Sequence, residues 1–254
     1  MRSRQEIKQI AKSAYKGQVG TCALILLVYM LLSAVSSFLS FLVVPVLTVG
    51  LQFCCLQVYT GQKTSVGSLF SGFERYGTNL GGMLWMNLLL LLWMIIPIIV
   101  YAVGLAFAVS INSVGLIALF ALLFFALMIP AFIKSYAYSM TPYILADCRE
   151  VRATQAVKLS NRITKGHKGK VFVMGLSFIG WALLCTLPVY VGMFFAFTGN
   201  AAVTAAFVSI GGLVSVALTM FFLYPYMYTA MAGLYLELKQ HAIEQGVASP
   251  EEFA

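Results

Sequence analysis

The charged residues of this chain are gathered into four blocks, which long uncharged apolar tracts separate. The blocks are residues 2–16, 63–75, 147–170 and 237–252, and Lys134 is the one charge outside them. The chain is 61% hydrophobic and 9% charged, where soluble domains average roughly 45–50% and 25%. The pattern therefore excludes a water-soluble fold and predicts one all-α membrane domain over residues 1–254.

The length of each apolar tract predicts a pair of transmembrane helices. Residues 19–61 would extend roughly 63 Å as one helix, about twice the 30 Å of a hydrocarbon core. The same reasoning applies to residues 80–147 and 171–240. We expect outer turns near Ser36, Ser37 and Ser40, near residues 110–113 and near residues 198–200. The prediction is six transmembrane helices arranged as three hairpins.

The distribution of Lys and Arg predicts the orientation. Five precede the first hairpin, two lie between the first and second, seven lie in residues 149–170, and Lys239 follows the third. The three expected outer turns contain none. By the positive-inside rule the N- and C-termini are cytoplasmic. Lys134 is then expected at the inner interface, where its aliphatic stem can snorkel.

A short amphipathic segment precedes each hairpin. In each, an apolar residue stands seven positions before a glycine, at Ile10 and Gly17, Phe70 and Gly77, and Leu159 and Gly166. We expect interfacial helices at residues 1–17 and 65–77 and in the basic segment 149–170, each glycine ending its helix in the left-handed conformation, and a tail at 241–254. Ile7, Ile10, Ala11 and Ala14 would share one face of the first helix. Anionic phospholipids are the expected partners of Arg4, Lys8, Lys12, Lys16, Arg162, Lys165, Lys168 and Lys170.

The inner ends of the second and third hairpins resemble each other. Four residues recur at a constant offset of 90, where Tyr136, Tyr138, Ser139 and Asp147 correspond to Tyr226, Tyr228, Thr229 and Glu237. Two explanations are open, namely a repeat of common origin and a chance match. An aromatic belt and helix-ending charges are one interpretation. The other is a hydroxyl-lined vestibule that opens inward. Its candidate residues are Lys134, Tyr136, Tyr138, Asp147, Tyr226, Tyr228 and Glu237.

The residues that usually carry intramembrane chemistry are missing from the predicted spans. The two histidines, His167 and His241, fall in charged blocks, and the chain has no HExxH and no Asp or Glu inside a span. Five cysteines form no CxxC pair. We therefore expect no enzyme, no metal and no cofactor. The net charge of +8 is assigned to cytoplasmic loops, so nucleic acid is not expected as a partner.

Five motifs in order resemble an uncharacterised bacterial membrane family, the domain of unknown function 975. They are Arg4-x-x-Ile7-Lys8-x-x-Ala11-Lys12 ending in Gly17, Leu69-Phe70-x-x-Phe73-x-x-Tyr76-Gly77, Tyr143-Ile144-Leu145-Ala146-Asp147, Ser177-Phe178-x-Gly180-Trp181, and Pro225-Tyr226 with Leu234-Tyr235. The resemblance implies a multi-pass, six-span protein of the bacterial cytoplasmic membrane, similar to membrane domains joined to bacterial glycerophosphodiester phosphodiesterases. It implies no catalytic residue and no substrate.

Two functions of different classes follow from these observations. The first is admission or transport of a small amphiphile, lipid or peptide across the cytoplasmic membrane. The second is a non-catalytic scaffold or regulator that binds anionic lipid, a partner membrane protein or a second copy of the chain. A polar cavity open to one side favours transport, whereas a dry, packed interior favours the scaffold.

Overall fold

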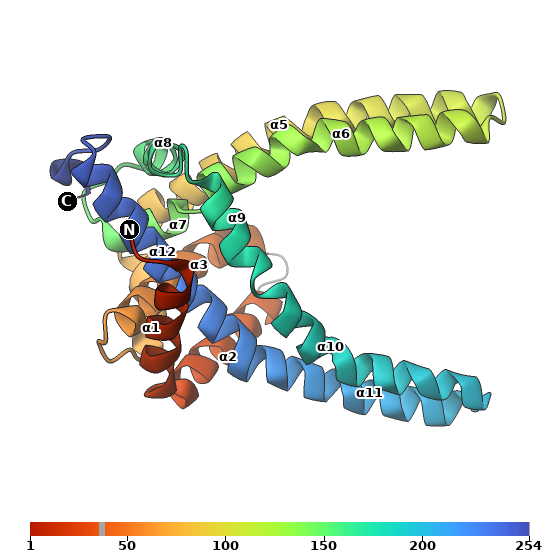
Figure 1. The fold of residues 1–254 in the computed structure, drawn as a ribbon, viewed down its shortest axis with the longest axis horizontal. Coiled ribbons are helices and arrows are strands. Elements are labelled where there is room, and N and C mark those ends of the chain that lie inside the picture. The colour runs from red at the N-terminus through yellow and green to blue at the C-terminus, as the bar shows by residue number, and fades with distance from the viewer. Residues whose placement is uncertain (36–38, 254) are drawn as a thin grey trace.

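The molecule consists of a packed body and two long helical hairpins that project from one side of it (Figure 1). The computed structural model describes residues 1–35 and 39–253, and within that part the regular elements are all helices. We name the hairpins the first arm and the second arm. The first arm is α5 (Tyr76–Ser110) with α6 (Val114–Tyr138), and the second is α10 (Ile179–Phe194) with α11 (Ala201–Leu218). Both chain ends lie at the side of the body away from the arms.

The body is built mainly from seven helices and one 3-10 turn. They are α1 (Arg4–Lys16), α2 (Val19–Val35), α3 (Ser40–Tyr59), α4 (Val66–Leu69), η1 (Phe70–Arg75), α7 (Thr141–Asp147), α8 (Ala153–Ile163) and α12 (Tyr224–Glu244). Four short elements complete the chain, namely α9 (Lys168–Leu176), η2 (Phe195–Thr198), the π-helical turn η3 (Thr219–Leu223) and η4 (Pro250–Phe253). The helix α3 lies at the centre and packs against α1, α2, α5, α7, α12 and η1.

Two glycines let the backbone of α3 approach the segment that follows it. A Cβ atom on Gly50 would lie 1.8 Å from the carbonyl oxygen of Leu69, and one on Gly72 would lie 2.3 Å from the carbonyl oxygen of Val46. Side chains of ordinary size cannot be accommodated at such separations, so glycine is required at both positions. The close approach buries α3 from Pro45 to Tyr59 on most of its sides.

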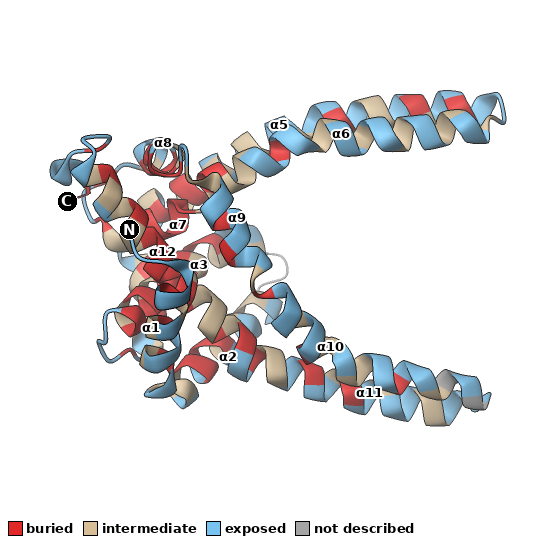
Figure 2. Ribbon diagram, viewed as in Figure 1, coloured by how far each residue is buried: buried red, intermediate tan, exposed pale blue. Residues whose placement is uncertain are grey.

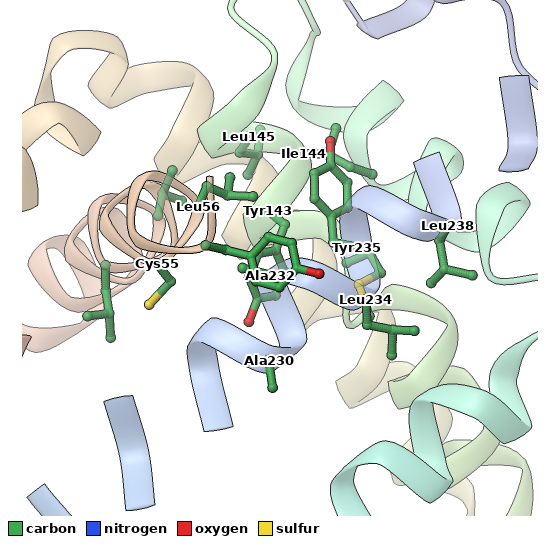
Figure 3. Close-up of a cluster of buried hydrophobic side chains, with 14 of the residues drawn as sticks. Cys55, Leu56, Tyr143, Ile144, Leu145, Ala230, Ala232, Leu234, Tyr235 and Leu238 are labelled. Atoms are coloured by element: carbon green, nitrogen blue, oxygen red, sulfur yellow. The ribbon is translucent and has the colours of Figure 1, made fainter. Parts of the chain in front are cut away.

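The apolar centre of the body joins segments that are far apart in the sequence. Cys55 and Leu56 of α3 lie on one side of Tyr143 of α7, and Tyr235 of α12 lies on the other side, next to Ile144 (Figure 3). The Tyr143 and Tyr235 rings are stacked, with centroids 5.8 Å apart. Aromatic side chains in this arrangement contribute more than their buried area alone. The three helices therefore form one continuous core.

The predicted amphipathic helix at residues 1–17 is α1, and its apolar face is covered by protein. Ser3 and Glu6 form a capping box at its start, in which the Ser3 amide donates to the Glu6 carboxylate at 2.7 Å. Ile7, Ala11 and Tyr15 are buried where α1 packs on α12 and α3. The apolar face of α1 therefore packs on the body, and Arg4, Lys12 and Lys16 lie on its exposed face.

Two of the three predicted glycine caps are wrong. Gly17 has φ −73° in the right-handed region, because the chain continues directly into α2 through a bend of 91°. Gly77 lies inside α5, which begins one residue earlier. Segment 65–77 is also not one helix but α4 followed by η1. Only Gly166, after α8, has the expected positive φ, at +80°.

The tips of the two arms fall at uncharged polar residues. In the first arm, Asn112 adopts φ 53° and the Ser113 hydroxyl caps α6. In the second arm, Gly199 adopts φ 71° and the Asn200 side chain caps α11. Ser36 and Ser37, where the first outer turn is expected, lie outside the described residues, and Ser40 begins α3.

Most residues of the arms are exposed or half-buried, whereas buried residues concentrate in the body (Figure 2). Leu122 and Phe125 of α6 are 69% and 68% exposed, and Leu213 of α11 is 73% exposed. Among the described residues, five helical stretches are long and apolar enough to cross a membrane. The number becomes six if the bent pair of α1 and α2 is counted as one stretch.

Candidate functional site

A polar cluster at the end of α7 connects the bases of the two arms. The Asp147 carboxylate accepts hydrogen bonds at Oδ2 from the Lys239 ammonium at 2.6 Å and from the Tyr235 hydroxyl at 2.8 Å. Asp147 ends the short helix that follows α6, and both partners lie on α12, which continues from the second arm. The Asp147 and Lys239 side chains are only about a quarter exposed (26% and 23%), so water screens the pair less than a surface pair.

The loop after Asp147 is held by an arginine from the chain before the first arm. The Arg75 guanidinium donates to the carbonyl oxygens of Cys148 at 2.8 Å and Val151 at 2.9 Å. Burial raises the pKa of the Cys148 thiol to about 11, so the thiol stays protonated at neutral pH and is a poor nucleophile. The cluster therefore fastens α7, α12 and the start of the first arm together.

The vestibule candidates of the first arm lie in separate surroundings. The Lys134 ammonium lies over the Trp93 ring, 5.1 Å from its centroid. Tyr136 meets the edge of Phe172 with centroids 5.6 Å apart, and Tyr138 packs with Val157 of α8. The cation of Lys134 is thus matched with an aromatic face of its own arm. Asp147 takes its cation from Lys239 of α12.

The three vestibule candidates on α12 line three different hollows. Tyr226 lines a groove beside α1, Tyr228 lines a small hollow between α2, α3 and α12, and Glu237 lines a polar hollow at the N-terminus. The Glu237 carboxylate accepts a hydrogen bond from the Arg2 amide at 2.8 Å. The described structure therefore does not gather the seven candidates around one cavity.

The basic residues of α1 are of two kinds. Lys8 is tied to the protein, because its ammonium donates to the Ser177 hydroxyl at 3.2 Å and lies over the Phe178 ring at 4.5 Å. Arg4, Lys12 and Lys16 are exposed. Only these three therefore leave their charge free for a partner at the surface.

The basic residues after the first arm divide in the same way. Arg162 binds the Glu252 carboxylate at 2.6 and 3.1 Å and the Val247 carbonyl oxygen, so it anchors the C-terminal segment. The Lys170 ammonium lies 2.9 Å from the Met1 sulfur. Lys165 is exposed and Lys168 is half-buried. Of the predicted lipid contacts here, Arg162 has its charge matched within the protein.

An apolar groove lies where α1 meets the base of the second arm. It has a volume of about 320 Å³, and its walls include Tyr15 of α1, Trp181 and Cys185 of α10, and Leu223 of η3. Lys12 and Lys16 stand at its rim. The volume lies at the low end of the roughly 300–1,000 Å³ of ordinary ligand pockets. An apolar interior with a cationic rim suits an anionic amphiphile.

Sequence reasoning missed several residues of the cluster and the groove. Tyr235 and Lys239 carry one available signal, because their spacing of four places them on one face of a helix. Tyr15 continues the buried series of Ile7 and Ala11 at the same spacing. Cys185 has no such signal and is identified only by the packing of α10 against its neighbours.

Potential metal ligands are dispersed across the described residues 1–35 and 39–253. In this part of the chain, no three His, Cys, Asp or Glu side chains are arranged to hold a metal ion. The two histidines, His167 and His241, lie with ring centroids 5.0 Å apart beside Lys170. Burial and the Lys170 charge lower the pKa of His167, which keeps that imidazole neutral at physiological pH.

Comparison with protein families matches the chain over nearly its whole length. Residues 1–242 match the family described as "Protein of unknown function (DUF975)". Comparisons with curated proteins and with solved structures gave no match. The match covers the body, both arms and nearly all of α12. The chain therefore belongs to the DUF975 family.

Proposed function

We propose that this chain is a multi-pass protein of the bacterial cytoplasmic membrane and acts there as a non-catalytic scaffold. Its body joins the cytoplasmic ends of three hairpins, which are α2 with α3 inside the body and the two arms. Its two arms stand apart in the bilayer, where they meet lipid and a partner membrane protein or a second copy of the chain. The observation that carries the proposal is the pair of long apolar arms mounted on a compact, packed body.

The dimensions of the arms support this placement. The 18 residues from Trp93 to the end of α5 at Ser110, and the 18 from Trp181 to Thr198, each extend about 27 Å, close to a hydrocarbon core of about 30 Å. Tryptophan favours the membrane interface. The two tryptophans therefore mark one depth at the base of both arms, and the Lys134 ammonium over the Trp93 ring lies at that depth as well.

The distribution of charge supports the orientation. Residues 76–133 and 171–236, which include almost the whole of both arms, contain no Asp, Glu, Lys or Arg. Lys134 lies in the last turns of α6, and the other basic residues lie in the body and in its connections, away from the tips of the arms. This asymmetry favours the charged elements of the body, with both termini, on the cytoplasmic side.

The interior of the body favours a scaffold over a transporter. The hollow between α2, α3 and α12 has only about 20 Å³ and is lined mainly by apolar side chains such as Ile25 and Leu51. A single water needs about 10–15 Å³ by this kind of measure. A substrate would have no room there unless the body came apart.

The proposal is tested by purifying the chain and reconstituting it in liposomes that contain fluorescent phosphatidylglycerol. Dithionite added outside bleaches only the outer leaflet unless the lipid crosses. We expect the bleached fraction to equal that of protein-free liposomes. A larger fraction that depends on the protein would reject the scaffold and support transport of an amphiphile.

A second measurement tests the role of the arms in cells. A photoreactive benzoylphenylalanine replaces Phe125 at the exposed surface of α6, and Phe253, which is buried in the body, serves as the matched control position. We expect a single cross-linked protein species from position 125, identified by mass spectrometry as one partner or a second copy, and none from position 253. Adducts to lipid alone would contradict the scaffold.

A further inference from the structure

The groove beside α1 is open along the base of the second arm. Trp181 of α10 and Phe222 of η3 are 53% and 59% exposed, so they form an open side. Leu223 and Cys185 are each 7% exposed and form a buried, apolar floor. Trp181 begins the part of the arm that we place in the bilayer. The open side of the groove therefore faces the inner leaflet.

A π-helical turn shapes one wall of the groove and binds it to α1. The turn η3 joins α11 to α12, and the Tyr15 hydroxyl donates a hydrogen bond to the carbonyl oxygen of Phe221 within it. Wide turns of this kind interrupt α-helices and are frequent at functional sites. The contact holds the C-terminal half of α1 against the second arm, so the rim residues keep a defined position over the groove.

Two cations stand at the rim without a matching anion. Lys12 and Lys16 lie four residues apart on α1, and both side chains are exposed. The residues that line the groove include no carboxylate. The ion pairs found among residues 1–35 and 39–253 involve neither lysine. Lys8, one turn earlier, is already bound to Ser177. The groove thus combines an apolar interior with two available positive charges.

We propose that this groove binds one acyl chain of an anionic phospholipid of the inner leaflet, with the lipid phosphate at Lys12 and Lys16. The volume of about 320 Å³ suits one chain better than a whole two-chain lipid. The two positive charges at the rim favour a headgroup with a net negative charge over a zwitterionic headgroup, in which a cation offsets the phosphate. The proposal rests on the membrane placement of the arms described above.

Native mass spectrometry of the full chain in detergent micelles tests the site without requiring a bilayer. Phosphatidylglycerol and phosphatidylcholine with the same acyl chains are titrated separately. We expect one phosphatidylglycerol bound per chain at the lowest concentrations and weaker binding of phosphatidylcholine. Equal binding of the two lipids would overturn the proposal. Failure of the topology predicted below would reject the membrane placement instead, so the two failures are distinguishable.

Three variants locate the bound lipid. Replacing both rim lysines (Lys12→Gln with Lys16→Gln) should weaken phosphatidylglycerol binding about tenfold or more. The charge-matched control, Lys63→Gln with Lys158→Gln, removes two exposed cations, one in the loop before α4 and one on α8, and should leave the binding unchanged. An equal loss in the control would show that surface charge alone accounts for binding, and would overturn the proposal.

The third variant, Cys185→Phe, fills the floor of the groove and leaves the rim charges in place. It should abolish the tight phosphatidylglycerol site. Helical content measured by circular dichroism verifies that it folds. If Cys185→Phe does not fold, the lysine variants on the exposed face of α1 decide the outcome by themselves. A folded Cys185→Phe chain that binds phosphatidylglycerol as tightly as the unaltered chain would contradict the site.

Discussion

The ammonium nitrogen of Lys239 lies 2.6 Å from the Oδ2 atom of Asp147, and Tyr235 donates to the same oxygen at 2.8 Å. Asp147 closes the segment that leaves the first arm, and Lys239 lies on the helix that continues from the second. The contact therefore joins the bases of both arms. Because the arms diverge beyond the body (Figure 1), such contacts within the body decide how they stand relative to each other.

Removing this ion pair should destabilise the body. We expect Asp147→Asn to lower the free energy of unfolding by about 1–2 kcal/mol, since the pair is partly buried and directly hydrogen-bonded. Combined with Lys239→Met in a double-mutant cycle in mixed micelles, it should show a coupling energy of similar size. The control pair is Glu74 and Arg149, whose side chains are 62% and 79% exposed, and its coupling should stay below about 0.5 kcal/mol. Equal coupling in the two pairs would refute the special role of Asp147.

Two adjacent glycines in the second arm should respond in opposite ways to alanine. A Cβ atom on Gly211 would lie 2.3 Å from the carbonyl oxygen of Pro188 in α10, whereas one on Gly212 would meet no atom within 4 Å. Gly211→Ala must push the two helices apart, at a cost of roughly 1–3 kcal/mol. Gly212→Ala should stabilise α11 by about 0.5–1 kcal/mol, because alanine favours the helix. Unfolding in micelles measures both effects, and a similar loss in the two variants would disprove the close packing of α10 on α11.

Cysteine labelling tests the membrane topology. In a background without the five native cysteines, Ile111→Cys and Ala201→Cys at the arm tips should react with an impermeant maleimide added outside intact cells. Lys63→Cys and Lys165→Cys in the body should react only after the membrane is opened. These tip positions avoid the positive φ of Asn112 and the capping side chain of Asn200. Labelling of position 63 from outside would mean that the first tract crosses once, and the six-span arrangement would fail.

Acidification should release the C-terminal segment from α8. Hydrogen bonds from Arg162 and the Ser249 amide lower the pKa of Glu252 below its usual value of 4.5. A carboxyl group with a lowered folded-state pKa stabilises the docked state above that usual value, and this contribution is lost as the pH falls through the folded pKa. The distance between spin labels at positions 158 and 251 should therefore increase below pH 4.5 and not above it.

A pair of variants isolates that carboxylate at neutral pH. With the same two labels, Glu252→Gln should already show the longer distance, because the amide cannot form the charge-assisted pair with Arg162. For the neighbouring carboxylate, the label is moved to the exposed position 249, and Glu251→Gln is compared with the unaltered chain. That change should leave the segment docked. If both substitutions release the C-terminal segment, the loss of any negative charge there would be sufficient, and the specific role of the Arg162–Glu252 pair would be refuted.

Local features of the sequence were sufficient to predict the helical class and several details of the helices. Apolar tracts longer than one span, with charges only between them, predict helices because a buried backbone must pair its own polar groups. The series Ile7 and Ala11 predicts α1, and the uncharged residues at 110–113 coincide with the tip of the first arm. In each case the signal lies within a few residues, where the helical period and the transfer cost of charge act directly.

Features that depend on two distant segments could not be predicted in this way. The caps expected at Gly17 and Gly77 are wrong, because the next helix begins almost at once and needs no left-handed residue. The vestibule interpretation groups Asp147 with Lys134, thirteen residues away, whereas the Asp147 carboxylate pairs with Lys239, ninety-two residues away. The spacing of apolar residues shows that a helix has a buried face. It does not show which other helix covers that face.

By itself, the sequence determined that the chain forms apolar helices separated by charged connections, because residue composition and period act locally. Only the tertiary structure decided that these helices divide into a body and two separate arms. The glycine contacts between α3 and η1, the position of Asp147 against α12, and the π-helical turn beside Tyr15 all depend on which surfaces meet. That choice follows from the packing of complementary side-chain shapes across the fold, and the order of residues along one helix does not contain it.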